Sequence, residues 1–473
     1  MPIITAHDLN ISDMKHIKTI CLLGLACLWS SCEKTLELQP VGSLATEEAL
    51  SDVPALRTAL FGLYHTLQAP AYYGKEFPWI SELGGNLVYL RLKKPNPLFT
   101  QYYSYTITPL NGPAQVWNAC YKTILKANNI INHIDGIEGD ATEKNQIKGE
   151  ALALRALAYF DLVRSFAKPY ATGDPLTDPG VPIVLTAGIY EPPRNTVAEV
   201  YDRIAGDLET AKPLMKKISP YRFSPDAADA LLARVNLYKG DWARAEQLAG
   251  AVIENGAYAL ADNVTALFAG PGSTEEIFTL KFEDSESTGA GNFGHQYNLS
   301  GQGDTGVSDD LIALYEPGDT RRSLIFTHTD GENYQTKFLA QNGIAGLHSP
   351  KLLRLAELYL IRAEARYRRN DTASALADLD SLRIKRGASA WISLPNGIAD
   401  ILHERQRELA FEGHTTFDYW RTGTTMTRTM CNTPLQYGAG PCQMEAADYR
   451  TVYPIPQTEK DANRSITQNT GYQ

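Results

Sequence analysis

Residues 72–90, YYGKEFPWISELGGNLVYL, combine aromatic and polar side chains in a pattern that could bind a sugar. Aromatic rings can stack on the flat C–H faces of sugar rings, while amides and carboxylates hydrogen-bond the hydroxyl groups. The segment supplies both kinds of group, in Tyr73, Trp79, Glu82, Asn86 and Tyr89. The alternative is that Trp79 and Tyr89 are core anchors that pin a loop. The pattern therefore predicts a ligand-binding loop and leaves a packing role open.

Residues 292–304, NFGHQYNLSGQGD, form a second candidate ligand segment through Phe293, His295 and Tyr297. Their glycines would let the backbone approach a ligand, or they could simply form turns. Residues 101–105, QYYSY, alternate like a β-strand, which predicts that their tyrosines pack rather than bind.

The sequence contains no convincing motif for catalysis or metal binding. Residues 289–294, GAGNFG, fit G-x-G-x-x-G, but no strand precedes them and no helix follows. Cysteines and histidines are too few at short spacing for a zinc site, so we predict no metal, cofactor or catalytic residue. A pair of carboxylates that hydrolyses glycosides stays open, because the chain has 54 acidic residues.

A charged stretch near residue 405 is interpreted as a helix surface. We expect His403 and Glu404 to lie on a solvated or capping face. Arg405, Arg407 and Glu408 are expected to form surface ion pairs, each worth a few tenths of a kcal/mol.

Composition narrows the classes of partner. The net charge is −10 and no basic run stands out, which argues against nucleic acid and against an electrostatic membrane anchor. An apolar fraction of 44% is ample for a folded core.

The N-terminal region has the layout of an export signal. In residues 15–34, KHIKTICLLGLACLWSSCEK, a basic end precedes a short apolar block and small residues. Cys32 directly follows two serines, which is typical of a bacterial lipoprotein whose cysteine carries lipid. We therefore predict a signal peptide over 1–31, with translation starting at Met14, and a tether over 32–45. A buried N-terminal helix is the alternative, and a single domain is expected over 46–473.

Two of the other cysteines bracket a Gly- and Pro-rich loop, CNTPLQYGAGPC. In an exported protein, Cys431 and Cys442 could close this loop as a disulfide. Two thiols that never meet are the alternative.

Pairs of helices organise the middle of the chain. Residues 226–256 and 356–387 each show apolar residues at helical spacing, interrupted by a turn. Gly240 and Asn370 coincide in the two turns, where a left-handed residue would be needed. Each pair is similar to a tetratricopeptide unit, but the two copies start 130 positions apart, at 226 and 356.

The fold class that follows is mainly α. Discontinuous tetratricopeptide-like pairs would form a rigid base, with further helices at 116–134, 145–166 and 399–413. Long irregular loops at 71–113, 261–350 and 423–453 would carry the function, and little β structure is expected.

Four segments in this order resemble the SusD/RagB family of Bacteroidetes outer-membrane lipoproteins. They are IKGEALALRALAYFDLVRSFAKPY (147–170), the pair at 356–387, HERQRELAFEGHTTFDYWRTG (403–423) and VYPIPQTEKDANRSITQNTGY (452–472). Two positions depart from the family pattern: Thr415 stands where Arg is usual, which would alter one local ion pair, and Arg464 replaces a common Pro.

The resemblance implies a lipoprotein that binds a nutrient oligomer, usually a glycan and sometimes a peptide, without changing it chemically. Its partner would be a TonB-dependent, SusC-like β-barrel transporter. Cys32 would anchor it to the outer membrane, facing the cell surface. Two alternatives stay open: a surface carbohydrate-active enzyme such as a glycoside hydrolase, and a helical-repeat scaffold that binds proteins.

Overall fold

The computed structural model describes residues 49–91, 98–297, 301–431 and 440–472. Leu50–Gln473 forms one compact unit, and Met1–Ala49 is a separate unit. The predicted signal peptide, Cys32 and the tether lie outside the described residues, so these boundaries stay predictions. Within the described ranges, no helix has the length and apolar character needed to cross a membrane.

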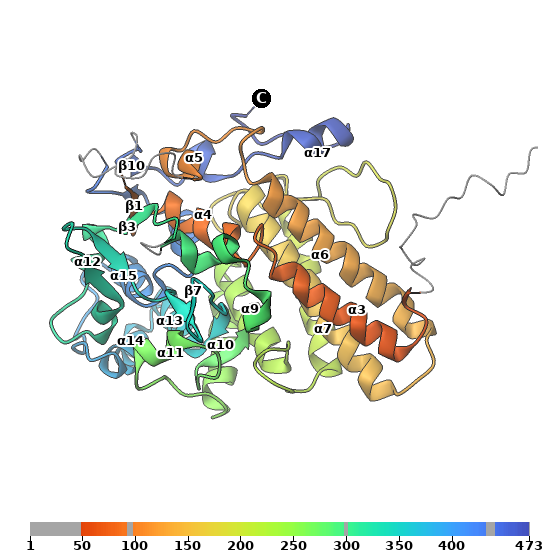
Figure 1. Cartoon of the computed structure of the whole chain (residues 1–473), viewed down its shortest axis with the longest axis horizontal. Coiled ribbons are helices and arrows are strands. Elements are labelled where there is room, and N and C mark those ends of the chain that lie inside the picture. The colour runs from red at the N-terminus through yellow and green to blue at the C-terminus, as the bar shows by residue number, and fades with distance from the viewer. Residues whose placement is uncertain (1–48, 92–97, 298–300, 432–439, 473) are drawn as a thin grey trace, which may run out of the picture. The chain divides into compact units, whose positions relative to one another are not determined.

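Long helices pack side by side in the first half of the compact unit (Figure 1). They are α3 (Val53–Leu67), α6 (Ala114–His133), α7 (Ala141–Phe166) and α8 (Val197–Ala211). The helix α7 contacts α3, α6 and α8, so its side chains are buried around most of its circumference. Local signals fix the helix starts, since Asp52, Asp140 and Thr196 each accept a hydrogen bond from a first-turn backbone N–H.

Two helix pairs form the centre of the unit. The first is α9 (Pro225–Lys239) with α10 (Trp242–Glu254), and the second is α13 (Leu355–Arg368) with α14 (Thr372–Lys385). The helix α10 packs on α13, so the pairs are neighbours in space despite their separation in sequence (Figure 1). Gly240 and Asn370 have φ of 80° and 65°, the left-handed conformation that the aligned turns predicted. The predicted mainly helical fold with discontinuous tetratricopeptide-like pairs is confirmed.

Shorter helices and small antiparallel strand pairs fill the long connections. The helices are α4 (Glu76–Gly84), α5 (Thr100–Ser104), α11 (Val264–Ala269), α12 (Asp309–Ile312), α15 (Ile398–Leu409), α16 (Thr415–Thr422) and α17 (Gln457–Ala462). The 3₁₀ turns are η2 (Ile134–Gly136), η3 (Lys212–Leu214), η4 (Asp284–Glu286), η5 (Gly289–Gly291), η6 (Phe293–Gln296), η7 (Thr320–Leu324) and η8 (Tyr449–Thr451).

Each strand pairs with one antiparallel partner. The strands are β1 (Val88–Leu90) with β3 (Thr305–Val307), β2 (Glu276–Thr279) with β8 (Lys351–Arg354), β4 (Ile325–Thr327) with β5 (Asn333–Gln335), β6 (Ala340–Gln341) with β7 (Ile344–Ala345), and β9 (Met426–Thr427) with β10 (Gln443–Met444).

The predicted strand at residues 101–105 is wrong, because α5 occupies this segment. Phe99 and Tyr105 flank it with left-handed backbone, at φ of 59° and 56°. Tyr102 and Tyr103 are both buried, whereas a strand would point them to opposite faces. Tertiary packing therefore overrides the local alternation, although the predicted packing role of these tyrosines is confirmed.

Charged side chains form a buried network between the second helix pair and α15. We call it the ionic cluster; its buried members are Glu275, Asp319, Arg321, Arg354, Arg383, Arg386, Glu404 and Glu408, and the half-buried Glu412 joins it through Arg354. At its centre, Glu408 accepts hydrogen bonds from Arg354 at 2.6 Å and from Arg386 at 2.9 Å. Burial alone would raise the pKa of Glu408, but the surrounding guanidinium groups hold that pKa well below its usual range.

The interpretation of the stretch near residue 405 as a helix surface is wrong for most of its side chains. Glu404, Arg405 and Glu408 are buried, Arg407 is half-buried, and only His403 is exposed. The physical reason is that η7 and α14 cover this side of α15 and supply arginines to its carboxylates. Helical spacing alone could not distinguish this face from a solvated one.

The C-terminal tail is tied back to the helical base. The Asn469 side-chain amide donates to the carbonyl oxygens of Phe166 at 2.8 Å and Tyr453 at 2.7 Å. The Gln468 side chain hydrogen-bonds both the N–H and the carbonyl of Ile455, at 2.8 Å each. Gln468 and Asn469, which belong to the family-like segment at 452–472 that we call the tail motif, therefore fasten the C-terminal tail to the end of α7 and to residues 453–455.

Candidate ligand-binding site

The structure brings the two predicted ligand segments together. Strand β1 ends the first segment and β3 follows the second, and Val88 pairs with Val307 while Leu90 pairs with Thr305. The pairing continues where the Arg91 N–H donates to the Asp304 carbonyl at 2.9 Å. Proximity of the two segments is therefore set by backbone hydrogen bonds.

Trp79 and Tyr89 point into the protein. Trp79 is fully buried and meets Phe99 edge-on, with ring centroids 5.2 Å apart. The Tyr89 ring covers Gly306, where an added Cβ would lie only 2.3 Å from Tyr89 Cζ. Position 306 therefore has to be glycine for this packing, and neither ring has a face open to a ligand.

Tyr73, Phe293 and Tyr297 lie at or beside a small inner cavity of about 30 Å³. Tyr73 Oη donates to Asp161 at 2.7 Å, and the Tyr297 ring packs against Phe293 and Phe411 at 5.4 and 5.8 Å. A space of this size holds roughly one water molecule. A sugar ring does not fit there.

Glu82 is buried and serves as a connection between α4 and the start of α16. It accepts hydrogen bonds from the backbone N–H groups of Gly413 and His414, at 2.8 and 3.2 Å, and from Thr415 Oγ1 at 2.7 Å. Burial raises the pKa of Glu82 to about 7 despite these hydrogen bonds. The carboxylate has no ion pair among the described residues, at the position where Thr415 replaces the family's usual Arg.

Asn86 is half-buried, and its Oδ1 has no hydrogen-bond partner among the described residues. It is the least covered of the seven predicted ligand residues, since the other six are buried. Their assignment to a ligand stays a prediction, and the burial of all five rings fits the packing alternative.

A larger hollow of about 790 Å³ lies elsewhere, and we call it the groove. Its walls come from the loop after α7, the turn after α16, the chain from Glu445 through η8, and the tail at residues 468–470. The volume is in the range of ligand-binding sites, commonly about 300–1,000 Å³. The loop after α7 thus meets three segments of the C-terminal part of the chain at one surface.

Tyr449 gives the groove an accessible aromatic ring. Its side chain is 46% exposed, and Tyr472 contacts the ring edge-on with centroids 5.1 Å apart. Gly471, at φ of 90°, lies under the ring, and a Cβ there would come within 2.3 Å of Tyr449 Cδ2. The Gly-Tyr of the tail motif therefore holds this ring in place.

Four carboxylates make up most of the charged groups in the described lining of the groove. Asp178 accepts a salt bridge from Lys168 at 2.7 Å, and Asp448 accepts one from Arg450 at 2.6 Å. The hydrogen bonds from Arg450 hold the pKa of Asp448 below its usual range. A ring beside hydrogen-bonding acceptors is what recognition of a hydroxylated ligand requires.

Sequence reasoning did not identify Tyr449 as a site residue. The sequence signals were its place in the long loop at 423–453, which was predicted to carry function, and in the polar stretch EAADYR. Nothing local shows that this stretch faces the loop after α7, because the contact depends on how the tail folds back.

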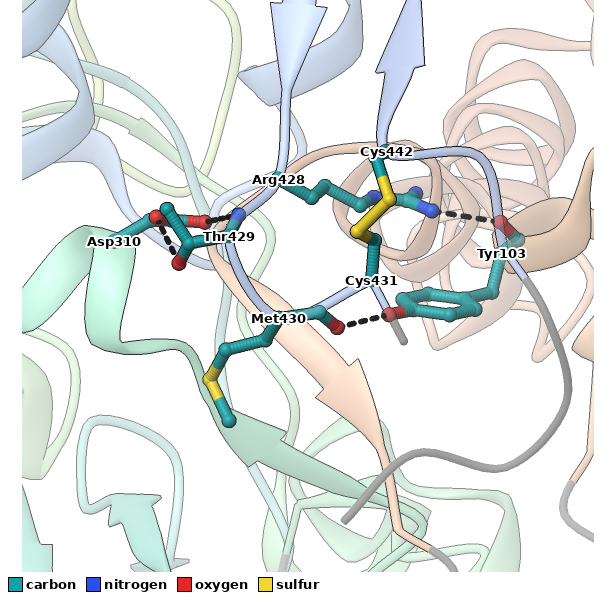
Figure 2. The surroundings of a disulfide bond; sticks show 7 residues. All are labelled: Tyr103, Asp310, Arg428, Thr429, Met430, Cys431 and Cys442. Carbon is teal, nitrogen blue, oxygen red and sulfur yellow. Dashed lines mark hydrogen bonds between the residues drawn. A yellow bond between two sulfur atoms is a disulfide. The ribbon is translucent and has the colours of Figure 1, made fainter. Parts of the chain in front are cut away.

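Cys431 and Cys442 form a disulfide, with Cα atoms 4.9 Å apart. Figure 2 shows that its surroundings tie three elements together. Arg428 donates to the Tyr103 carbonyl at 2.8 Å, and its guanidinium lies 4.1 Å from the Tyr103 ring centroid. Thr429 bonds Asp310 through both its N–H and its hydroxyl. The disulfide alternative is therefore the one that the structure adopts, next to β9 and β10.

Within the described part of the chain, no group of three or more His, Cys, Asp or Glu side chains is arranged to hold a metal ion. The groove offers an aromatic surface, hydroxyls and carboxylates, and this set can bind a ligand through stacking and hydrogen bonds.

Comparison with known families gives two matches that follow each other along the chain. Residues 95–237 match a SusD-like family described as starch-binding and associating with the outer membrane. Residues 313–472 match the SusD family.

Individual relatives and structures agree with these matches. SusD-like protein P38 of Formosa agariphila is 30% identical over 262 residues, which span 53% of this chain and 48% of that protein. SusD-like protein P2 of the same organism is 26% identical and is matched over 82% of this chain and 87% of its own length. A crystal structure of a SusD superfamily protein from Bacteroides thetaiotaomicron superposes with a TM-score of 0.82 at 28% identity, covering 88% of this chain and 99% of that one.

Proposed function

The chain belongs to the SusD/RagB family, and from that premise we propose that it is an outer-membrane lipoprotein that captures an oligosaccharide. It then delivers the bound oligosaccharide to a TonB-dependent, SusC-like transporter. The observation that carries the proposal is the match to a family described as starch-binding and outer-membrane-associated. The ligand leaves chemically unchanged.

The groove is the part of the structure that suits this role best. It is open, it presents the accessible Tyr449 ring, and hydroxyl and carboxylate oxygens surround that ring. Stacking and hydrogen bonding of this kind hold a sugar without a reaction. The seven residues predicted from the sequence lie outside the lining of the groove, and six of them are buried. Their role in binding stays a prediction.

Anchoring follows from the N-terminal sequence. The predicted signal peptide ends before Cys32, which would carry the lipid in the outer membrane. A protein tethered in this way is held beside a membrane transporter, which makes transfer of the ligand geometrically possible.

Calorimetry tests the capture role. The lipoprotein, purified in detergent, would be titrated with a panel of oligosaccharides and short peptides, and each ligand would then be examined by mass spectrometry. Saturable binding of an oligosaccharide that is recovered intact is the expected result. A cleaved oligosaccharide would favour the carbohydrate-active enzyme, and binding of peptides alone would contradict the proposed ligand class.

A matched pair of variants locates the site. Tyr449→Ala removes the ring in the groove, and we expect it to weaken oligosaccharide binding about tenfold or more, since stacked aromatic anchors commonly contribute 1–2 kcal/mol. Tyr190→Ala is the control, because Tyr190 is similarly exposed, at 52%, and lies outside the groove. Equal binding by both variants would place the ligand elsewhere.

Delivery requires a partner, which co-purification tests. Affinity-tagged protein isolated from outer membranes is expected to bring a β-barrel transporter with it. The Cys32→Ser variant controls for the anchor, because it should fail to enrich the membrane-bound complex. A wild-type preparation without any barrel protein would contradict the transfer step.

A further inference from the structure

Acidic side chains outnumber basic ones in the described lining of the groove. Four carboxylates line it, from Asp174, Asp178, Glu445 and Asp448, whereas Lys168 is the one cationic side chain in its described lining. Lys168 neutralises Asp178 at 2.7 Å, and Arg450, just outside the lining, neutralises Asp448 at 2.6 Å. The groove is therefore acidic once these pairs are taken into account.

Asp174 and Glu445 are the two carboxylates left without an ion pair among the described residues. Both side chains are exposed. Asp174 Oδ1 accepts one weak hydrogen bond, at 3.3 Å, from the Leu176 N–H. Most of their capacity to accept hydrogen bonds therefore remains available to a ligand.

The loop that carries Asp174 is fixed from within. The Asp174 N–H donates to Asp178 Oδ2 at 2.7 Å, and the Gly173 N–H donates to the Pro169 carbonyl at 3.0 Å. On the other segment, the Asp448 N–H donates to the Glu445 carbonyl at 3.0 Å, which fixes the turn before Tyr449. The carboxylates and the ring are thus held on ordered turns.

We propose that the groove selects ligands by charge: it takes glycans that are uncharged or carry amino groups, and it rejects glycans that carry carboxylate or sulfate groups. This inference rests on the proposed function and concerns the class of oligosaccharide. Free carboxylates accept hydrogen bonds from hydroxyls and attract ammonium groups, and the face of Tyr449 attracts cations as well as C–H groups. The net charge of −10 adds a repulsion that lowers the local concentration of anionic ligands.

Ligands with one backbone and different charge test this inference. The intact lipoprotein would be titrated with four β-1,4-linked hexamers, of glucose, N-acetylglucosamine, glucosamine and glucuronic acid. At slightly acidic pH and low salt, we expect glucosamine to bind most tightly, the two neutral hexamers next, and glucuronic acid weakest. Each step should be about threefold to tenfold, as for a few exposed charge contacts. In about 1 M salt the order should flatten, because screening then acts within about 3 Å.

The double variant Asp174→Asn/Glu445→Gln should bind the neutral hexamers nearly as well as wild type and lose the discrimination by charge. The control Glu138→Gln/Asp202→Asn makes the same change in net charge at two exposed acids outside the groove, and it should keep the discrimination.

The outcomes separate this inference from the proposed function. Binding of the glucuronic acid hexamer as tight as that of the glucose hexamer would overturn the inference and leave glycan capture intact. Unchanged discrimination in the groove double variant would do the same, by placing the selecting charges elsewhere. Failure of all four hexamers to bind would overturn the inference for β-1,4-linked glycans, and the calorimetric panel would then decide whether the protein captures a glycan of another linkage.

Discussion

The ionic cluster and the groove both contain pairs of a basic and an acidic side chain, but the pairs are buried in the cluster and partly exposed to solvent in the groove. In the cluster, Arg386 and Glu408 lie 2.9 Å apart with side chains 1% exposed. In the groove, Lys168 and Asp178 lie 2.7 Å apart with side chains 56% and 13% exposed. The distances are alike, so burial decides what each pair does. A buried pair cannot lose one partner cheaply, whereas an exposed pair can exchange its partner for water or for a ligand.

Removing a carboxylate from the cluster should have the largest effect. Glu408→Ala leaves the guanidinium groups of Arg354 and Arg386 buried without their central acceptor. We expect a loss of about 3–5 kcal/mol in the free energy of unfolding, measured by urea denaturation. Glu209→Ala is the control, since its pair with Arg244 is exposed, and should cost less than about 1 kcal/mol. Similar losses in the two variants would contradict the contrast between buried and exposed pairs.

Loss of the disulfide should have the second-largest effect on stability, because a disulfide restrains the unfolded chain whether or not it is buried in the folded one. Cys431 and Cys442 are 11 positions apart, and replacing both with Ser should lower the free energy of unfolding by about 2–3 kcal/mol. Reductant should lower the stability of the wild type by a similar amount and leave the double variant unchanged. A variant as stable as the oxidised wild type would show that the hydrogen bonds of Arg428 and Thr429 hold this region by themselves.

The buried carboxyl group of Glu82 should make the free energy of unfolding depend on pH. Its folded pKa of about 7 lies above the ordinary value of 4.5, so its contribution to stability is fully present below pH 4.5 and is lost as pH rises through 7. The stability of wild type relative to Glu82→Gln should therefore fall between pH 5 and 8, by an amount on the order of 2 kcal/mol.

Burial depresses the pKa of His414, so this histidine makes the free energy of unfolding rise with pH, opposite to the effect of Glu82. For this reason the difference between the two proteins is the quantity to measure, by urea denaturation at each pH. A difference that stays constant with pH would mean that Glu82 does not titrate in this range.

The smallest effect is expected at the edge of the groove. Lys168→Ala removes an exposed partner of Asp178, and the free energy of unfolding should change by less than about 1 kcal/mol. Thermal denaturation at low and high salt would check this result. A loss of several kcal/mol would mean that the groove is part of the rigid structure, as the cluster is.

Much of the helical fold could be predicted because its signals are local. The apolar spacing of the two helix pairs and the left-handed turns at Gly240 and Asn370 depend on residues close in sequence. The packing of α10 on α13 is a contact between the two helix pairs. The sequence showed that the pairs resemble each other, but no residue in either pair indicated that they are neighbours in space.

The exposure of the predicted ligand residues could not be read from the sequence, because it depends on which face of a segment is covered. Trp79 and Tyr89 have a composition suited to a ligand loop, but the packing of Phe99 and Gly306 turns both inward. The same limitation affected Glu404 and Glu408, which have the spacing of surface charges and lie under η7 and α14. In each case a distant segment determines the exposure.

The fastening of the tail has a consequence for what a truncation would remove. Asn469 closes onto the carbonyl of Phe166, a residue 303 positions earlier in the sequence. Without residues 468–472, the end of α7 would lack this partner and the groove would lack the support of Gly471 and Tyr472. We expect a chain truncated before Gln468 to keep the helices of the first half, whose contacts do not involve the tail, and to lose the fixed position of the Tyr449 ring.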